Sequence, residues 1–169
     1  MATLHLRKLG HTRIGMIGGP VETLCSRMRV DGYQDALRST GVAVEPELIR
    51  SGDFGVGSGY REALALLRQP DRPTAIFAGS DMQALGVYQA ARELGLEIPR
   101  DLSVVGYDDL PVAQWVSPTL TTVHQPLHRM AEMATRLVLD LARGVTPSAL
   151  RMDLAVEMRV RQSTAEPAS

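Results

Sequence analysis

Two adjacent carboxylates, Asp108 and Asp109, are the residues of this chain whose type and place most strongly suggest chemistry. They directly follow the apolar run Val104–Tyr107, which is typical of a buried strand. Open parallel sheets bind their ligands at the edge where the strands end. A carboxylate at that edge accepts two hydroxyl hydrogen bonds at once, which suits a polyol or a sugar. The alternative is a pair of loop carboxylates that accept hydrogen bonds from nearby backbone N–H groups.

Two arginines and a phenylalanine are further candidates for the same edge. Arg27 and Arg29 lie two residues apart near the start of a helical segment, so they face different directions. One of them can project over the sheet edge and bind a ligand through two donors, although their position alone favours a solvated surface. Phe54 follows Gly52 and Asp53 after a predicted strand. Its ring can stack on a sugar or a planar base, or cover the core, and both interpretations stay open.

The remaining motifs argue against enzyme chemistry, a metal and a cofactor. The glycines of Gly55–Gly59 lack the spacing of a dinucleotide fingerprint, and Lys8, the only lysine, lies far from them. His124 and His128 are four residues apart, but a proline lies between them and no further ligand pattern accompanies them. Cys25 has no base partner in the sequence, and no nucleophile elbow exists. The sequence therefore predicts no catalytic residues, no metal and no cofactor.

Composition narrows the class of protein further. The 169 residues are 44% hydrophobic and 22% charged, which is ordinary for a soluble globular protein. The net charge of −1 and the 4% of aromatic residues favour neither a DNA-binding surface nor a stacking platform for single strands. A lone cysteine excludes an intrachain disulfide and fits a reducing compartment. Without an apolar leader or a run long enough to cross a bilayer, a cytoplasmic location is expected.

The elements that must position these residues alternate between strand and helix patterns. Such alternation predicts an α/β fold with a doubly wound parallel sheet and flanking helices. Glycines at the ends of the helical segments and Ser80 or Asp81 at the start of the third one support these boundaries. The expected strands are 14–17, 48–49, 75–78 and 104–107, and the expected helices are 24–37, 60–67 and 82–94.

Four further expectations concern the residues after Asp109. Trp115 lies in a loop, where packing beneath the loop is favoured over exposure to a partner. Apolar residues at helical spacing over 127–141 predict an amphipathic helix with one apolar face. Alternating apolar residues over 152–160 predict a strand with one buried face. Residues from about Gln162 onward are small and polar, and we expect them to fray.

Several segments of this sequence resemble motifs of the lactose-repressor (LacI) family of transcription regulators, in the family's order and spacing. They are GHTRIGMIGGP at 10–20, SRMRVDGYQDAL at 26–37, PTAIFAGSD at 73–81, IPRDLSVVGYDD at 98–109 and PTLTTVHQP at 118–126. The resemblance covers nearly the whole chain. It implies a core like that of type I periplasmic binding proteins, in which two doubly wound lobes enclose a small-molecule effector.

The resemblance also implies how the chain divides. Residues 1–12 would end the last helix of the first lobe, and residues 13–123 with 155–162 would form the second lobe. Residues 124–153 would belong to the mostly missing first lobe, and residues 163–169 would be a disordered tail. The apolar face of 127–141 would then lack its partner. Seven apolar side chains are worth about 1.5–3 kcal/mol each when buried, so we expect repacking, self-association or poor order.

By resemblance, the effector ligands are Arg29, Phe54, Asp108 and Gln125, with Ser80 where the family often has asparagine. The implied function is the effector-binding and dimerisation portion of a LacI-type regulator, whose helix-turn-helix is absent from this sequence. A homodimer, a sugar or nucleobase effector, and DNA contact only through that missing motif are expected. The alternatives are a solute-binding protein of a sugar transporter and, more distantly, an α/β enzyme.

Overall fold

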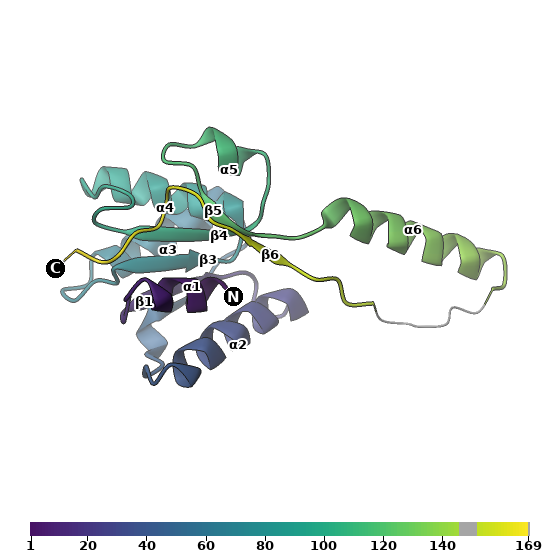
Figure 1. The fold of residues 1–169 in the computed structure, drawn as a ribbon, viewed down its shortest axis with the longest axis horizontal. Coiled ribbons are helices and arrows are strands. Elements are labelled where there is room, and N and C mark those ends of the chain that lie inside the picture. The colour runs from purple at the N-terminus through teal and green to yellow at the C-terminus, as the bar shows by residue number, and fades with distance from the viewer. Residues whose placement is uncertain (146–151, 169) are drawn as a thin grey trace.

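The computed structural model describes residues 1–145 and 152–168, and these form one six-stranded sheet with helices on both faces (Figure 1). The strands are β1 (Ile14–Gly18), β2 (Ile49–Ser51), β3 (Ala75–Ala78), β4 (Ser103–Asp108), β5 (Thr121–His124) and β6 (Glu157–Arg159). The helices are α1 (Ala2–Lys8), α2 (Leu24–Ser39), α3 (Val56–Leu67), α4 (Asp81–Glu93), α5 (Val112–Trp115) and α6 (Leu127–Ala142), with a 3-10 turn η1 at Pro46–Leu48.

The sheet order β2-β1-β3-β4-β5-β6 confirms the predicted doubly wound fold. Strands β1 to β5 are parallel, so their carboxyl ends share one edge. The chain turns from β1 outward to β2 and then back across to β3, which creates a topological switch point between β1 and β3. The strand expected over 152–160 is shorter, because only Glu157–Arg159 pairs with β5, and it runs antiparallel.

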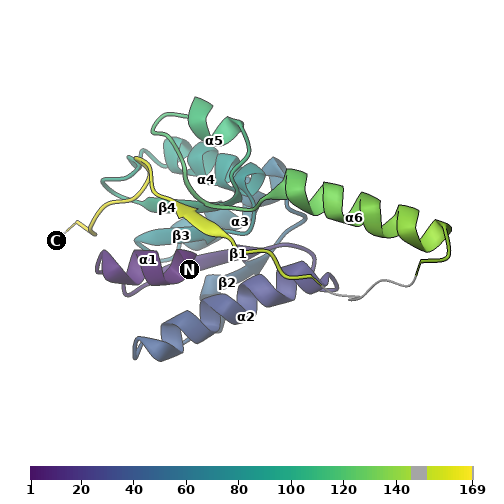
Figure 2. The same ribbon diagram turned by 45° about the vertical axis from the view of Figure 1, so that its right-hand side comes forward.

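Two apolar clusters fill the two faces of the sheet. Helices α3 and α4 cover one face, where Leu66, Ile76 and Val104 are fully buried. Helices α1 and α2 cover the other face around Met16 and Tyr33 (Figure 2). The contact between α3 and α4 is close because it contains glycines. A Cβ atom at Gly86 would lie 2.3 Å from the carbonyl oxygen of Val56 and from the backbone nitrogen of Tyr60.

The structure corrects the expectation that residues 1–12 end a helix of another lobe. Ala2 and Leu6, one helical turn apart, are buried in the same cluster as Met16 and Tyr33. His11 is 1% exposed, and its Nε2 donates to the carbonyl oxygen of Ala165 at 2.9 Å. This segment therefore packs as part of the lobe that the rest of the sheet forms, because its apolar face fits that sheet.

Residues 163–168 also differ from the expected disordered tail. Ser163 is fully buried, and its hydroxyl accepts from the backbone N–H of Thr121 at 2.8 Å and donates to the carbonyl oxygen of Val104. The N–H of Val104 in turn donates to the carbonyl oxygen of Ser163 at 2.8 Å. Small polar side chains can thus fix a segment by pairing backbone groups at the sheet, which a hydrophobicity pattern does not reveal.

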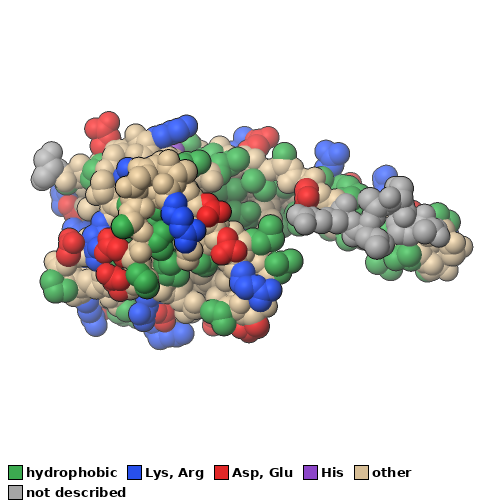
Figure 3. All heavy atoms as spheres, turned by 90° about the horizontal axis from the view of Figure 1, so that it is seen from below, with side chains coloured by type: hydrophobic (Ala, Val, Ile, Leu, Met, Phe, Trp, Pro, Cys, Tyr) green, Lys and Arg blue, Asp and Glu red, His purple; other side chains and the backbone are tan. Residues whose placement is uncertain are grey.

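Helix α6 extends away from the lobe, and we call this projection, residues 125–145 and 152–156, the arm (Figures 1 and 2). None of the residues of α6 is buried. Hydrophobic side chains are spread along the arm in the space-filling view (Figure 3). Val138 is 63% exposed and Leu141 is 52% exposed. The described part of the lobe does not repack onto this face, so self-association stays a prediction.

We expect the 169-residue chain to self-associate through the apolar face of α6, because burying that face removes hydrocarbon from water. Sedimentation should detect species larger than the monomer. Val138→Glu should weaken the association about tenfold or more, since a buried valine contributes about 1.5 kcal/mol. Glu132→Gln on the same helix is the matched control and should leave it unchanged. A chain that stays monomeric and binds no hydrophobic dye would contradict this expectation.

Candidate functional site

The backbone at the carboxyl edge of the sheet is held in a sparsely populated conformation. Three non-glycine residues of the described chain have a positive φ, namely Phe54 at 67°, Asp108 at 115° and Asp109 at 59°. Phe54 follows β2, and the two aspartates end β4 and begin its loop. Left-handed backbone costs non-glycine residues about 1–3 kcal/mol and concentrates at functional sites. The candidate edge from the sequence is therefore also the strained edge of the fold.

Arg29 lies over this edge rather than in solvent. Its guanidinium carbon is 3.9 Å from the centroid of the Tyr107 ring and 5.2 Å from that of Phe54. One terminal nitrogen donates to the carbonyl oxygen of Gly79, beside the switch point, and the other lies 3.6 Å from Asp108. Stacking on aromatic rings suits the flat guanidinium group. Helix α2 thus positions Arg29 at the switch point between β1 and β3.

Asp108 joins Arg29 and Gln125 into one network. Nε2 of Gln125 donates to Oδ1 of Asp108 at 2.7 Å, and the same oxygen is the one that faces Arg29. Among the described residues, Oδ2 of Asp108 has no hydrogen-bond or ion-pair partner. Burial raises the pKa of Asp108, while the Gln125 hydrogen bond and the Arg29 charge oppose that shift. The network therefore offers one unused carboxylate oxygen within a charge-balanced cluster.

Phe54 and Ser80 form the neighbouring part of the edge. The Phe54 ring lies directly on Gly19, since a Cβ atom there would be 2.0 Å from the ring. Ser80 is the N-cap of α4, where its hydroxyl accepts from the N–H of Gln83 and donates to the carbonyl oxygen of Phe54 at 2.8 Å. Ser80 is 4% exposed, so it holds the Phe54 loop in place and has no free donor for a ligand.

A cavity of about 480 Å³ opens beside the network, where the arm meets the lobe. Arg29, Tyr107 and Gln125 contribute to its wall, and Met28 and Met130 line its apolar part. Phe54, Ser80 and Asp108 do not line it. Of the residues implied by resemblance, Arg29, Asp108 and Gln125 thus form one connected group. Phe54 joins it through Arg29, and Ser80 lies behind Phe54.

Two residues of this region, Tyr107 and Asp81, were not identified as functional candidates by the sequence analysis. The ring of Tyr107 stacks against the Arg29 guanidinium. Its place directly before Asp108, at a strand end, is the signal that points to it. Asp81 is fully buried and accepts from the hydroxyl of Thr122 and from the N–H of Leu110, both at 2.6 Å. Glycine at 106 makes room for it, since a Cβ atom there would lie 2.3 Å from Oδ1 of Asp81.

Other candidates lie elsewhere or support no chemistry. Trp115 is 79% exposed, so the expectation that it packs beneath its loop is wrong, because the short helix α5 turns it outward. Arg27 is exposed and donates to the carbonyl oxygen of Glu22, as its position suggested. The described residues contain no group of three or more potential metal ligands. No helix among them is long and apolar enough to cross a membrane.

The comparisons with known proteins agree on one family. Residues 3–164 match the model of the periplasmic binding protein-like domain. The HTH-type transcriptional repressor PurR from Proteus mirabilis is 39% identical over 98% of this chain and 49% of its own length. The ribose operon repressor of Escherichia coli K12 is 36% identical over 96% of this chain and 49% of its own length. The chain belongs to the LacI-type branch of the periplasmic-binding-protein-like family.

Solved structures agree with this assignment. The transcriptional regulator CelR in complex with cellobiose superposes with a TM-score of 0.91 at 37% identity, over 95% of this chain and 49% of that one. A dimeric Lac repressor superposes with a TM-score of 0.89 at 31% identity, over 98% of this chain and 60% of that one. The chain spans about half the length of the curated relatives it matches. These relatives are transcriptional regulators rather than enzymes.

The stability of the fold should depend on pH through Asp81. Burial raises the pKa of Asp81 from 3.8 to about 6. The folded state therefore binds this proton more tightly than the unfolded state does, and the stabilisation is lost as the pH rises through about 6. Between pH 4 and pH 7, urea unfolding should show the wild type losing about 1–3 kcal/mol relative to Asp81→Asn.

Asp101→Asn is the control for this measurement. Hydrogen bonds from Arg100 and from the N–H of Glu97 lower the pKa of the half-buried Asp101. Its contribution to stability is lost only below about pH 4, so its difference from the wild type should stay constant between pH 4.5 and 7. Parallel stability curves for the wild type and Asp81→Asn would contradict the assignment of a raised pKa.

Proposed function

We propose that this chain is the effector-binding and dimerisation portion of a LacI-type DNA-binding transcription regulator. The observation that carries the proposal is the Arg29–Asp108–Gln125 network, with its unused Asp108 oxygen at the carboxyl edge of the sheet. Because the chain spans about half of its relatives, DNA contact is assigned to a helix-turn-helix outside this sequence. We expect no sequence-specific operator binding by the chain alone.

The geometry supports an uncharged effector, a sugar or a nucleobase. Arg29 is already neutralised by Asp108 and bonded to Gly79, so an anionic ligand would have to break that pair. Asp108 retains one acceptor oxygen, which suits a hydroxyl or a ring N–H. The relative solved with cellobiose and the ribose operon repressor are consistent with the sugar class.

The effector in this proposal lies between two lobes. Residues 13–123 and 155–162, with α1 added, form one wall, and residues 124–153 belong to the opposite lobe. Of that last range, residues 146–151 lie outside the described residues. The exposed apolar face of α6 supports this division, since the opposite lobe would bury it. Effector binding then shifts the equilibrium between lobe arrangements, and the lobes pass that shift to the DNA-binding part.

A homodimer is part of the same proposal. Trp115 on α5 is 79% exposed and Met82 at the start of α4 is 38% exposed, and such residues are enriched at protein interfaces. A dimeric Lac repressor is among the similar structures. Like DNA-bound regulators generally, the protein is proposed to act in the cytoplasm, without catalysis of its own. The curated relatives are repressors, which favours this function over a transporter subunit or an α/β enzyme.

Effector binding by the full-length regulator should raise its melting temperature. A ligand at about 100 times its Kd adds about 2.7 kcal/mol to the free energy of unfolding, which is a shift of several degrees. A panel of sugars and nucleobases should contain at least one such compound. Asp108→Asn should weaken its binding about tenfold to a hundredfold, because a hydrogen bond to a charged group is worth about 1.5–3 kcal/mol.

Asp35→Asn is a suitable control, since Asp35 is an exposed carboxylate on α2 that pairs with Arg38 and lies outside the network. It should leave the ligand-induced shift unchanged. A ligand that stabilises the wild type and Asp108→Asn equally would show that the Asp108 edge does not bind the effector.

A further inference from the structure

Asp108 and Asp109 are neighbours in sequence, but they have separate partners. Asp108 contacts Gln125 and Arg29, whereas Asp109 contacts His124 and Arg161. Both aspartates adopt a positive φ. The two consecutive pairs, Asp108 with Gln125 and Asp109 with His124, therefore join the end of β4 to the end of β5 side by side.

The Asp109 carboxylate is the centre of a compact ion cluster. Nη2 of Arg161 donates to its Oδ1 at 2.6 Å, and Nδ1 of His124 lies 3.1 Å from its Oδ2. Nε of Arg159 lies 4.0 Å from the same Oδ2. The Asp109 side chain is 11% exposed, so solvent screens these interactions less than it screens surface ion pairs.

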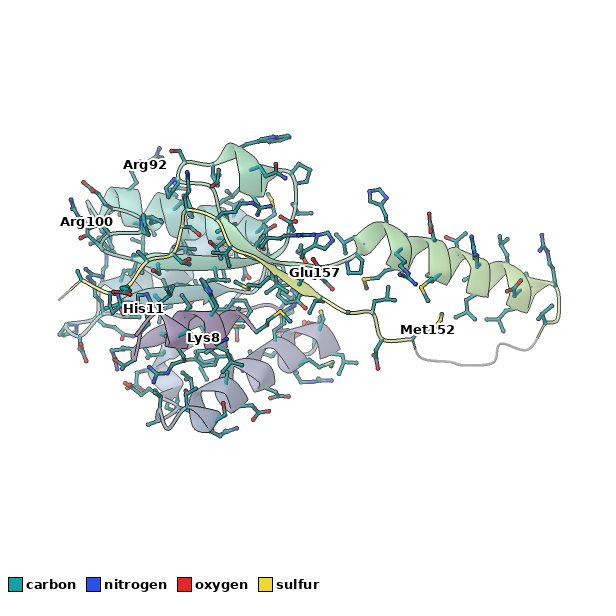
Figure 4. The ribbon with its side chains drawn as sticks, in the orientation of Figure 1. Lys8, His11, Arg92, Arg100, Met152 and Glu157 are labelled. Carbon is teal, nitrogen blue, oxygen red and sulfur yellow. The ribbon has the colours of Figure 1, made fainter. Side chains whose placement is uncertain are left out.

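The partners of Asp109 lie where the chain enters and leaves the arm. His124 is the last residue of β5, directly before the segment that leads to α6, and Arg159 ends β6, which carries the returning chain. Figure 4 shows Glu157 of β6 at the base of the arm and Met152 farther out on the returning segment. Arg161 also donates to the carbonyl oxygen of Leu120 at 2.8 Å, just before β5.

We propose that Asp109 is a positioning residue that fixes the direction in which the two connections of the arm leave the lobe. Its carboxylate ties both connections to the end of β4 and leaves the effector contacts to Asp108. A ligand that replaces Gln125 as the hydrogen-bond partner of Asp108 displaces Asp108, and Asp109 is the next residue of the chain. Ligand binding at Asp108 is therefore coupled to the direction of the arm through these two adjacent residues. Only this last step rests on the proposed function, and the test below needs no effector.

The distance between two spin labels tests the positioning role directly. Cys25, the only cysteine of the chain, is exposed at the start of α2 and accepts one label. Arg136→Cys on the exposed surface of α6 accepts the other. Double electron–electron resonance on labelled chain diluted with unlabelled chain then reports the orientation of the arm. Asp109→Asn removes the charge, keeps the size and tolerates the positive φ.

We expect a broader or displaced distance distribution in Asp109→Asn than in the parent double-cysteine chain. Arg161→Gln, a second variant that removes the partner charge, should broaden it in the same way, and Arg161→Lys should restore it in part. The N–H of Arg161, which donates to Thr121, should also exchange about tenfold faster in Asp109→Asn, as local opening becomes easier.

Asp35→Asn is the matched control, because Asp35 pairs with Arg38 on α2 and contacts neither Asp109 nor its partners. It should leave the distribution as in the parent. An unchanged distribution in Asp109→Asn and Arg161→Gln would overturn the proposal, as would equal broadening in the control. If Asp109→Asn does not fold, the Arg161 pair of variants decides the question alone.

Discussion

The peptide that joins Asp108 to Asp109 is the constraint on which the rest of this lobe depends. Both residues adopt a left-handed backbone at the end of β4, and this sends their carboxylates to different partners. The surroundings maintain that conformation. The Asp81 carboxylate beneath the loop accepts a hydrogen bond from the N–H of Leu110, and Arg161 in the last segment donates a hydrogen bond to Asp109. A strained backbone persists only where such contacts determine it.

Sequence patterns predicted much of this arrangement. The alternation of strand and helix from 73 to 108 gave the parallel sheet, and the place of Asp108 after a buried strand gave the ligand edge. Patterns did not place Arg29, because its role depends on the Tyr107 ring and the Gly79 carbonyl, which only the folded sheet brings to it. The family resemblance pointed to Arg29, and the structure shows which groups it contacts.

The errors have physical causes of the same kind. Hydrophobic periodicity reports neither the hydrogen bonds that bury Ser163 nor the outward turn of α5 that exposes Trp115. The family resemblance assigned residues 1–12 to the other lobe, whereas Ala2 and Leu6 of α1 pack in the same cluster as Met16 and Tyr33. Local pattern thus predicts elements well, whereas polar contacts between segments distant in sequence decide how tails and caps are fixed.

The central claim is that the Arg29–Asp108–Gln125 network lines an effector site. Titration of the ¹⁵N-labelled chain with ribose, cellobiose and adenine, followed by nuclear magnetic resonance, tests it most directly. The account predicts weak, saturable shifts of the Arg29 guanidinium and Gln125 side-chain amide signals for at least one ligand, with the His11 end of the sheet unmoved. Saturable binding that leaves both of these signals in place would contradict it.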